Sequence, residues 1–253
     1  MSTVTTITQE PVTTVAQARA LIGDTPGGTT PARGERIHNF VREHRFENCL
    51  ELGFAHGVGS TYIASALEAN GRGRLTSVDV PSALERSPLA SELLEQAGLS
   101  HRVTVEIEQT SYTWFLHRTL REQLRDSTIE PIYDFVFLDG AHTWDVDGFA
   151  FLLVDKLLKP GGWILFDDLY WRLDAERWPD VPAEQRAVTQ VKEVWDLLVL
   201  THPGYDEMRS DGSWGWAHKA TTPSPETRVV SEAAPLLAQL REVARYARER
   251  SPL

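Results

Sequence analysis

The stretch that most constrains the fold is residues 48–60, Asn-Cys-Leu-Glu-Leu-Gly-Phe-Ala-His-Gly-Val-Gly-Ser. The apolar residues from Cys49 to Leu52 predict a short strand, and the glycines that follow predict a tight loop. Glycine permits a positive φ and lets a ligand approach the main chain closely. A helix beginning near Ser60 would present backbone N–H groups and a partial positive charge to that ligand. An ordinary strand-to-helix turn is the alternative interpretation.

The composition narrows the class of protein and its partners. A chain of 253 residues is long enough for one α/β domain with a sizeable core. Its 25 basic and 36 acidic residues give a net charge of −11, which argues against nucleic acid and anionic membranes as partners. The single cysteine, Cys49, cannot form an internal disulfide, and no apolar run approaches the roughly 20 residues that span a bilayer. Residues 1–13 lack the cationic and hydrophobic parts of a secretory signal, so we expect a cytoplasmic protein.

The order of the predicted elements indicates a doubly wound α/β fold. Short apolar strands alternate with helices, which predicts right-handed βαβ units and a mostly parallel sheet. A closing pair, 205–209 and 214–219, is joined by a turn so short that the two strands must be antiparallel. With 49–52, the other predicted strands are 74–80, 103–107, 133–138 and 163–166, which makes seven. The predicted helices are 14–22, 35–43, 61–68, 88–97, 114–124, 149–158 and 187–200.

The same pattern predicts three regions along the chain. Residues 1–46 form a tail and two cap helices, residues 47–220 form the α/β domain, and residues 221–253 form a linker and an amphipathic helix. The C-terminal helix could pack on the domain or join two copies in a homo-oligomer. In helix 114–124, the candidate core residues are Trp114, Leu116, Leu120 and Leu124.

The predicted site consists of the polar residues at the strand ends, because open α/β sheets bind ligands outside the carboxyl ends of their strands. These residues are Glu51, Asp79, Gln109 to Ser111, Asp139 to His142, and Asp167 with Asp168. A carboxylate at the end of the second strand, here Asp79, suits the two hydroxyls of a ribose; a helix cap or turn residue is the alternative. Glu51 could accept a hydrogen bond from a ligand amine or fix N–H groups of its own loop.

The acidic residues that follow the fourth and fifth strands, Asp139, Asp167 and Asp168, predict a cation site. Adjacent strand ends bring these carboxylates close together, where each raises the pKa of the others unless a cation neutralises them. Magnesium and calcium prefer such oxygen ligands. In the alternative interpretation, Asp167 or Asp168 caps the next segment and Asp139 holds the ligand.

Four motifs together resemble a known family. The form E-x-G-x-x-x-G-x-G of residues 51–59 resembles the first motif of class I S-adenosylmethionine-dependent methyltransferases. With residues 76–79 (Thr-Ser-Val-Asp), 135–142 (Phe-Val-Phe-Leu-Asp-Gly-Ala-His) and 158–168 (Leu-Lys-Pro-Gly-Gly-Trp-Ile-Leu-Phe-Asp-Asp), residues 47–168 resemble the metal-dependent O-methyltransferases of the catechol type. They are similar also to the antibiotic-tailoring branch with the macrocin methyltransferases and the cephalosporin hydroxylase-like group.

The resemblance implies a Rossmann-like methyltransferase fold and a role for each matching residue. It implies that the loop with Glu51, Gly53, Ala55, Gly57 and Gly59 holds the methionine part of S-adenosylmethionine. The ribose would bind Asp79, the adenine would lie near Thr110 and Ser111, and Asp139 would border the cofactor. A divalent cation, Mg²⁺ or another, would be held by Asp139, Asp167 and Asp168.

Two departures from the catechol type bear on the chemistry. That type has Asn at the position of Asp168, and a lysine that deprotonates the acceptor at the position of His142. A histidine can also act as general base near neutral pH, so we expect His142 or Asp139 to take the proton. A structural or outer-shell role for His142 is the alternative.

The resemblance predicts an enzyme that methylates a hydroxyl of a small molecule, such as a secondary metabolite or sugar in antibiotic biosynthesis. Aromatic residues after the acidic strand ends could wall an aromatic or glycosidic acceptor: Trp144, Tyr170, Trp171 and Trp178. His56 is interpreted as packing its own loop. Three alternatives stay open: a metal-independent enzyme with His142 as base, an enzyme of the same fold that rearranges its substrate, and a cofactor-binding accessory protein.

Overall fold

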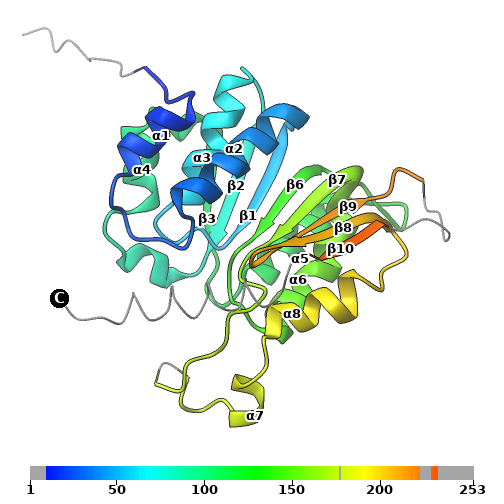
Figure 1. Cartoon of the computed structure of the whole chain (residues 1–253). Coiled ribbons are helices and arrows are strands. Elements are labelled where there is room, and N and C mark those ends of the chain that lie inside the picture. Colours follow the sequence, from blue (N-terminus) through cyan, green and yellow to red (C-terminus); the bar gives the residue numbers. More distant parts are fainter. Residues whose placement is uncertain (1–9, 177, 223–228, 233–253) are drawn as a thin grey trace, which may run out of the picture. The chain divides into compact units, whose positions relative to one another are not determined.

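A computed structural model of the chain describes residues 10–176, 178–222 and 229–232 (Figure 1). The chain forms two compact units, Met1–Gln109 and Thr110–Leu253. The predicted C-terminal helix over 232–248 lies outside the described residues, apart from residue 232. The predicted division into residues 1–46, 47–220 and 221–253 stays a prediction.

The first unit contains a parallel sheet of β1 (Asn48–Leu52), β2 (Arg74–Asp79) and β3 (Val103–Ile107) in that order. Its helices are α1 (Val15–Ile22), α2 (Pro31–His44), α3 (Val58–Ala69) and α4 (Ala90–Gln96), with short 3₁₀ turns at Pro81–Glu85 and Ser100–Arg102. The sequence predicted these three strands to within two residues. Their parallel pairing brings the ends of β1 and β2 to one edge of the sheet, where Glu51 and Asp79 lie.

The two N-terminal helices pack on the helix that follows the glycine loop. Ala18 and Ile22 of α1 share a buried apolar cluster with Val58 and Tyr62 of α3. The Tyr62 ring also lies so close to Gly34 in α2 that a Cβ there would come within 2.0 Å of it. Figure 1 shows α1, α2 and α3 together in the blue and cyan part of the chain. Within this unit, α1 and α2 therefore help to fix α3.

The second unit contains the strands that were predicted to close the sheet. Its strand order is β10-β8-β9-β7-β6, with β6 (Tyr133–Leu138) parallel to β7 (Leu158–Phe166). The strands β8 (Tyr205–Asp211) and β9 (Trp214–Lys219) are antiparallel to each other, and β9 is antiparallel to β7. The helices are α5 (Tyr112–Gln123), α6 (Trp144–Leu157), α7 (Ala183–Arg186) and α8 (Gln190–Val194), which a π-helical turn extends over Trp195–Val199. The predicted antiparallel hairpin is confirmed.

Three short strands were not predicted. β10 (Val229–Glu232) pairs in parallel with β8, inside the stretch interpreted as linker and helix, and brings the described strands beyond the predicted seven. The strands β4 (Leu124–Arg125) and β5 (Thr128–Ile129) form a small hairpin after α5. Strands of two to four residues carry no usable alternation, so only their pairing identifies them.

The cores of both units are apolar. No helix in the described part of the chain has both the length and the apolar character needed to cross a membrane. The side chains of β6 from Phe135 to Leu138 and of β7 from Trp163 to Phe166 are buried, as expected of parallel strands covered on both faces.

Candidate functional site

The glycine loop after β1 requires glycine for two different reasons. Gly53 has a φ of +91°, and its N–H donates to the carbonyl of Val78 at 2.8 Å, which joins the loop to β2. Gly57 has a φ of +80°, and a Cβ at this position would lie 2.8 Å from the Cβ of Ala90. The loop therefore needs both the left-handed backbone and the close approach of α4 that only glycine allows.

The helix after this loop begins earlier than predicted. Its N-cap is Gly57 in the left-handed conformation rather than Ser60, so α3 starts at Val58 and includes Gly59 and Ser60 in its first turn. No side chain caps this end. The first backbone N–H groups of a 12-residue helix and its partial positive charge thus meet the glycine loop, an arrangement that suits an anionic group of a ligand.

Asp79, at the end of β2, holds the glycine loop. Its Oδ2 accepts the backbone N–H groups of Phe54 and Ala55 at 2.9 and 2.8 Å, and its Oδ1 accepts that of Val80 at 2.7 Å. A carboxylate can accept about four hydrogen bonds. These three leave room on Oδ1 for one hydroxyl, rather than for both ribose hydroxyls, so the predicted contact with a ribose stays a prediction.

Glu51 is buried beneath the loop, and its hydrogen bonds are with side-chain hydroxyls rather than with the loop N–H groups of the second predicted alternative. Its Oε2 accepts hydrogen bonds from the hydroxyls of Ser60 in α3 and Ser77 in β2, the latter at 2.7 Å. Burial raises the pKa of Glu51 from 4.5 to about 7, opposed by these two hydroxyls, while the charge of Asp79 raises it further. Glu51 thus fastens β1 to its neighbours.

The other predicted residues around the loop have structural contacts. His56 Nδ1 donates to the carbonyl of Pro88 at 3.0 Å, in agreement with its interpretation as a loop-packing residue. Ser111 is the N-cap of α5, where its hydroxyl accepts the N–H of Thr113 at 3.2 Å, and Thr110 beside it is exposed. The predicted adenine contact of Thr110 and Ser111 stays a prediction.

In the second unit, the acidic residues follow β6 and β7 as predicted. The Asp167 N–H donates to the carbonyl of Leu138 at 3.0 Å, which continues the pairing of the two strands to their ends. His142 Nε2 lies 3.9 Å from Asp139 Oδ1 and 3.9 Å from Asp168 Oδ2. These three side chains therefore converge on one point.

Two of these residues have an unusual backbone. His142 has a φ of +56° and Asp168 a φ of +54°, and Ala55 of the glycine loop has a φ of +48°. The left-handed conformation costs an L-residue about 1 kcal/mol or more, and such strain concentrates at functional sites. The strain therefore supports a functional role for the turns that carry Ala55, His142 and Asp168.

The carboxylates do not assemble into a recognisable cation site. Across the described residues, no group of three or more histidine, cysteine, aspartate or glutamate side chains is arranged to hold a metal ion. Asp167 Oδ1 accepts the N–H of Asp168 at 2.6 Å, which is the capping contact of the alternative interpretation. The predicted metal ligands Asp139, Asp167 and Asp168 are oxygen donors of a suitable type, but their arrangement does not fit a bound ion.

The turn with His142 is held by residues that were not predicted. Asp147 in α6 is buried, and the hydroxyl of Tyr112 donates to its Oδ1. Burial raises the pKa of Asp147, while the charge of His142, the Tyr112 hydroxyl and the N–H groups of His142 and Thr143 lower it. The sequence held a signal for this residue, since an aspartate beside Gly148, Ala150 and Phe151 lies on the apolar face of its helix.

Aromatic residues after β7 lie beside His142. The ring centroids of His142 and Trp171 are 5.1 Å apart, and Trp178 packs edge-on against Trp171 at 5.2 Å. Of the other predicted wall residues, Tyr170 is buried and Trp144 is 41% exposed. The Arg186 guanidinium donates from Nη1 to the carbonyls of Trp178, Pro179 and Val181. Residues 178–186 are therefore folded back on themselves.

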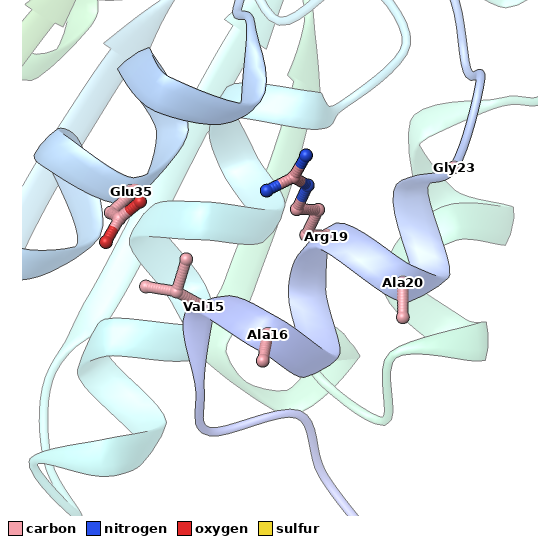
Figure 2. Close-up of a pocket in the computed structure, with 6 residues that line it drawn as sticks. All are labelled: Val15, Ala16, Arg19, Ala20, Gly23 and Glu35. Carbon is pink, nitrogen blue, oxygen red and sulfur yellow. The ribbon is translucent and has the colours of Figure 1, made fainter.

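A shallow depression of about 630 Å³ lies elsewhere, in the first unit. Figure 2 shows its lining, with Val15, Ala16, Arg19 and Ala20 on α1, Gly23 at the end of that helix and Glu35 on α2. None of the strand-end residues lines it. We place the candidate site at the strand ends, because Glu51 with its raised pKa and the left-handed residues Ala55, His142 and Asp168 are there.

The comparisons with known proteins concern the part of the chain that contains these residues. Residues 50–169, which include the glycine loop and Asp79, Asp139, Asp167 and Asp168, match the profile of a family described as Methyltransferase domain. A search of curated protein sequences found no significant match.

Solved structures of low sequence identity share the fold. The O-methyltransferase TomG from Streptomyces achromogenes, involved in tomaymycin synthesis and solved with S-adenosylmethionine, is 20% identical with a TM-score of 0.55, over 85% of this chain and 92% of that chain. The O-methyltransferase from Bacillus cereus, in complex with S-adenosylhomocysteine, is 20% identical with a TM-score of 0.56, over 81% and 88%. The methyltransferase PaMTH1 from Podospora anserina, bound to S-adenosylhomocysteine, is 15% identical with a TM-score of 0.58, over 82% and 86%.

The shared fold is the Rossmann-like methyltransferase fold, a mostly parallel sheet with flanking helices and a C-terminal antiparallel hairpin. Together with the profile match over residues 50–169, this fold supports assignment of the chain to the class I S-adenosylmethionine-dependent methyltransferases.

Proposed function

We propose that this chain transfers the methyl group of S-adenosylmethionine to a hydroxyl oxygen of a small molecule. The observation that carries the proposal is His142 Nε2, held 3.9 Å from each of two carboxylates at the ends of β6 and β7. Transfer to oxygen needs a group that accepts the hydroxyl proton, and an imidazole between carboxylates suits this role. The O-methyltransferases of similar fold support oxygen as the acceptor atom.

The first unit would bind the cofactor. The turn over Gly53 to Gly57 brings the main chain close to a ligand, and the uncapped N terminus of α3 suits the carboxylate of its methionine part. Asp79 would accept one ribose hydroxyl on Oδ1 while it keeps the loop in place. When bound, S-adenosylmethionine would supply a methyl group already activated by the sulfonium.

His142 would take the proton of the acceptor hydroxyl on Nε2. The imidazolium formed would lie beside the Asp139 and Asp168 carboxylates, which stabilise a positive charge at this distance. Further catalysis would come from alignment of the two reactants, because a well-oriented pair reacts far faster than a freely diffusing one.

The metal-dependent form of the proposal assigns a divalent cation such as Mg²⁺ to Asp139, Asp167 and Asp168. Since the arrangement of these residues does not fit a bound ion, we derive no step through one. Its test is a titration of Mg²⁺ into the protein and into an Asp167→Ala/Asp168→Ala variant. Heat from the first titration and none from the second would support the assignment.

Trp171 and Trp178 would form a wall of the acceptor site, because both are half-buried, Trp171 lies beside His142 and Trp178 packs edge-on against Trp171. Tryptophan faces bind aromatic rings and the C–H faces of sugars. The net charge of −11 supports a small molecule over nucleic acid as the acceptor.

The proposal is tested with S-adenosylmethionine labelled in its methyl group and a panel of phenols, catechols and methyl glycosides, with and without EDTA. We expect label in an ether product and an equal amount of S-adenosylhomocysteine. A His142→Gln variant should form product at least 100-fold more slowly, since a general base contributes about 10²–10⁴-fold. A product labelled on nitrogen or carbon would contradict the proposal, as would a His142→Gln variant as fast as the wild type.

A further inference from the structure

The turn between β6 and α6, residues 139–144, carries His142 in a strained conformation. Its φ of +56° is unfavourable for a residue with a side chain. Without contacts to its surroundings, the turn would adopt a backbone conformation of lower free energy, so neighbouring groups must hold it. They are found on three elements of the same unit.

Side chains of these elements accept two N–H groups of the turn, one on each side of His142. Ala141 donates to the hydroxyl of Tyr112 in α5 at 3.2 Å. The buried Asp147 carboxylate of α6 lies near His142 and Thr143, whose N–H groups lower its pKa. Trp144 donates to Oε1 of Gln190 in α8 at 2.8 Å. Hydrogen bonds from α5 and α8 thus fix the turn at Ala141 and Trp144, on either side of His142.

Tyr112 and Asp147 are also fixed to each other. Tyr112 donates its hydroxyl to Asp147 Oδ1, and both side chains are buried, at 3% and 0% exposure. The Tyr112 ring lies against Gly140, where a Cβ would come within 2.3 Å of the ring. The turn therefore closes over the tyrosine, and Gly140 is the residue that permits it.

Stability alone gives no reason for a buried carboxylate at this position. Burial of an ionisable group costs free energy, and well-packed apolar side chains of similar volume are often as stabilising or more so. The pair accepts the N–H of Ala141 and lies against Gly140, in the strained turn that carries a candidate catalytic histidine. An effect of the pair on the position of His142 would explain why the carboxylate is there.

We propose that Tyr112 and Asp147 are positioning residues that hold the turn so that the His142 imidazole stays between Asp139 and Asp168. This inference rests on the proposed function in one respect: it takes the place of His142 beside these carboxylates as the productive one. Tyr112 and Asp147 touch neither cofactor nor acceptor in this scheme and act through the backbone of the turn.

The test compares Tyr112→Phe and Asp147→Asn with Tyr205→Phe. Tyr205 is a matched control, because it is also a buried tyrosine of the second unit and lies against a different carboxylate, that of Asp155. Hydrogen exchange of single amides and the ring ¹⁵N signals of His142, both measured by NMR, report on the turn without any acceptor. We expect exchange at Ala141, His142 and Thr143 to rise at least tenfold in the first two variants, with shifted or broadened His142 ring signals. The control should leave both unchanged.

Turnover separates positioning from a purely structural role. With an acceptor that the wild type methylates, we expect Tyr112→Phe to lower kcat at least tenfold and to leave the KM for S-adenosylmethionine unchanged. Unchanged exchange and ring signals, or effects equal to those of Tyr205→Phe, would overturn the inference. Faster exchange with an unaltered kcat would also overturn it. If no acceptor is methylated by any variant, the proposed function fails, whereas the exchange and ring signals still decide whether Tyr112 and Asp147 hold His142.

Discussion

At the residue scale, Glu51 is an ionisable residue whose carboxyl group is buried, and burial disfavours its charged form. Its pKa is raised to about 7 because burial disfavours the charged form more than two hydroxyl donors restore it. Its two hydrogen bonds join β1 to β2 and α3 directly below the glycine loop. The protonation state of Glu51 therefore affects the support of the glycine loop, which would bind the cofactor.

The raised pKa predicts a loss of stability as the pH rises. Between pH 4.5 and about 7 the unfolded chain releases this proton before the folded chain does, so the free energy of unfolding falls with pH and levels off above 7. A shift of this size corresponds to about 3 kcal/mol. We expect Glu51→Gln to remove this fall, as measured by urea denaturation at pH 5 and pH 8. Glu43→Gln, a substitution of an exposed residue in the same unit, should keep the wild-type fall. An equal change in the free energy of unfolding between pH 5 and pH 8 in all three proteins would contradict the role of Glu51.

The two glycines Gly57 and Gly71 separate backbone strain from steric overlap. Gly57→Ala would add a strained left-handed alanine and a contact of 2.8 Å with Ala90, whereas Gly71→Ala would add only the strain, because nothing lies within 4 Å of its Cβ. We expect a loss of about 1 kcal/mol for Gly71→Ala and of about 2–4 kcal/mol for Gly57→Ala. Thermal or urea unfolding measures both losses. Equal losses would show that α4 does not restrict the loop.

At the element scale, the segment from Trp171 to Arg186 depends on one side chain. Arg186 donates to three carbonyls within eight residues of it, and this keeps Trp178 against Trp171. We expect Arg186→Met to speed proteolysis and hydrogen exchange over residues 174–182 and to raise the KM of the acceptor. The affinity for S-adenosylhomocysteine should stay unchanged. Arg172→Met, which removes an exposed arginine of the same segment, is the control; the same effects in that variant would refute the role of Arg186.

The sequence predicted most elements because their periods are strong, and it failed where one residue decides a boundary. The helix α2 begins at Pro31, four residues before the predicted start, since proline suits the first turn of a helix. The start of α3 was misplaced because a left-handed Gly57 serves as its N-cap. In α5 the buried face runs through Tyr112, Leu116 and Thr119, so the predicted core residues Trp114 and Leu124 are 56% and 40% exposed.

The candidate site was predictable in its strand-end residues and less so in their contacts. The motifs located Glu51, Asp79, Asp139 and His142, because strand ends follow from the order of elements. Pattern alone could not reveal that Asp79 is largely occupied by its own loop, since hydrogen bonds depend on the backbone that the loop adopts. Tyr112 and Asp147 were missed because their pairing joins residues 35 positions apart.

At the scale of the whole molecule, the candidate residues fall into two groups that can be tested separately. Those proposed to bind the cofactor, Glu51 to Gly59 and Asp79, belong to the first unit, and Asp139, His142 and Asp168 belong to the second. We expect Asp168→Asn to leave the affinity for S-adenosylhomocysteine within about threefold of the wild type while it lowers turnover. Isothermal calorimetry and a turnover assay on one preparation check this; a large loss of affinity would contradict the assignment of Asp168 to acceptor chemistry.

The central claim, a cofactor site on the glycine loop, is tested most directly by calorimetric titration of S-adenosylhomocysteine into the wild type and Asp79→Ala, with Gly71→Ala as a control. We expect a dissociation constant of about 1–100 μM for the wild type and the control, which corresponds to about −8 to −5.5 kcal/mol. Asp79→Ala should lose the binding, because the loop loses two hydrogen bonds and the cofactor loses the proposed acceptor of its ribose hydroxyl. Absence of binding by a folded wild type, or unchanged binding by a folded Asp79→Ala variant, would contradict the claim.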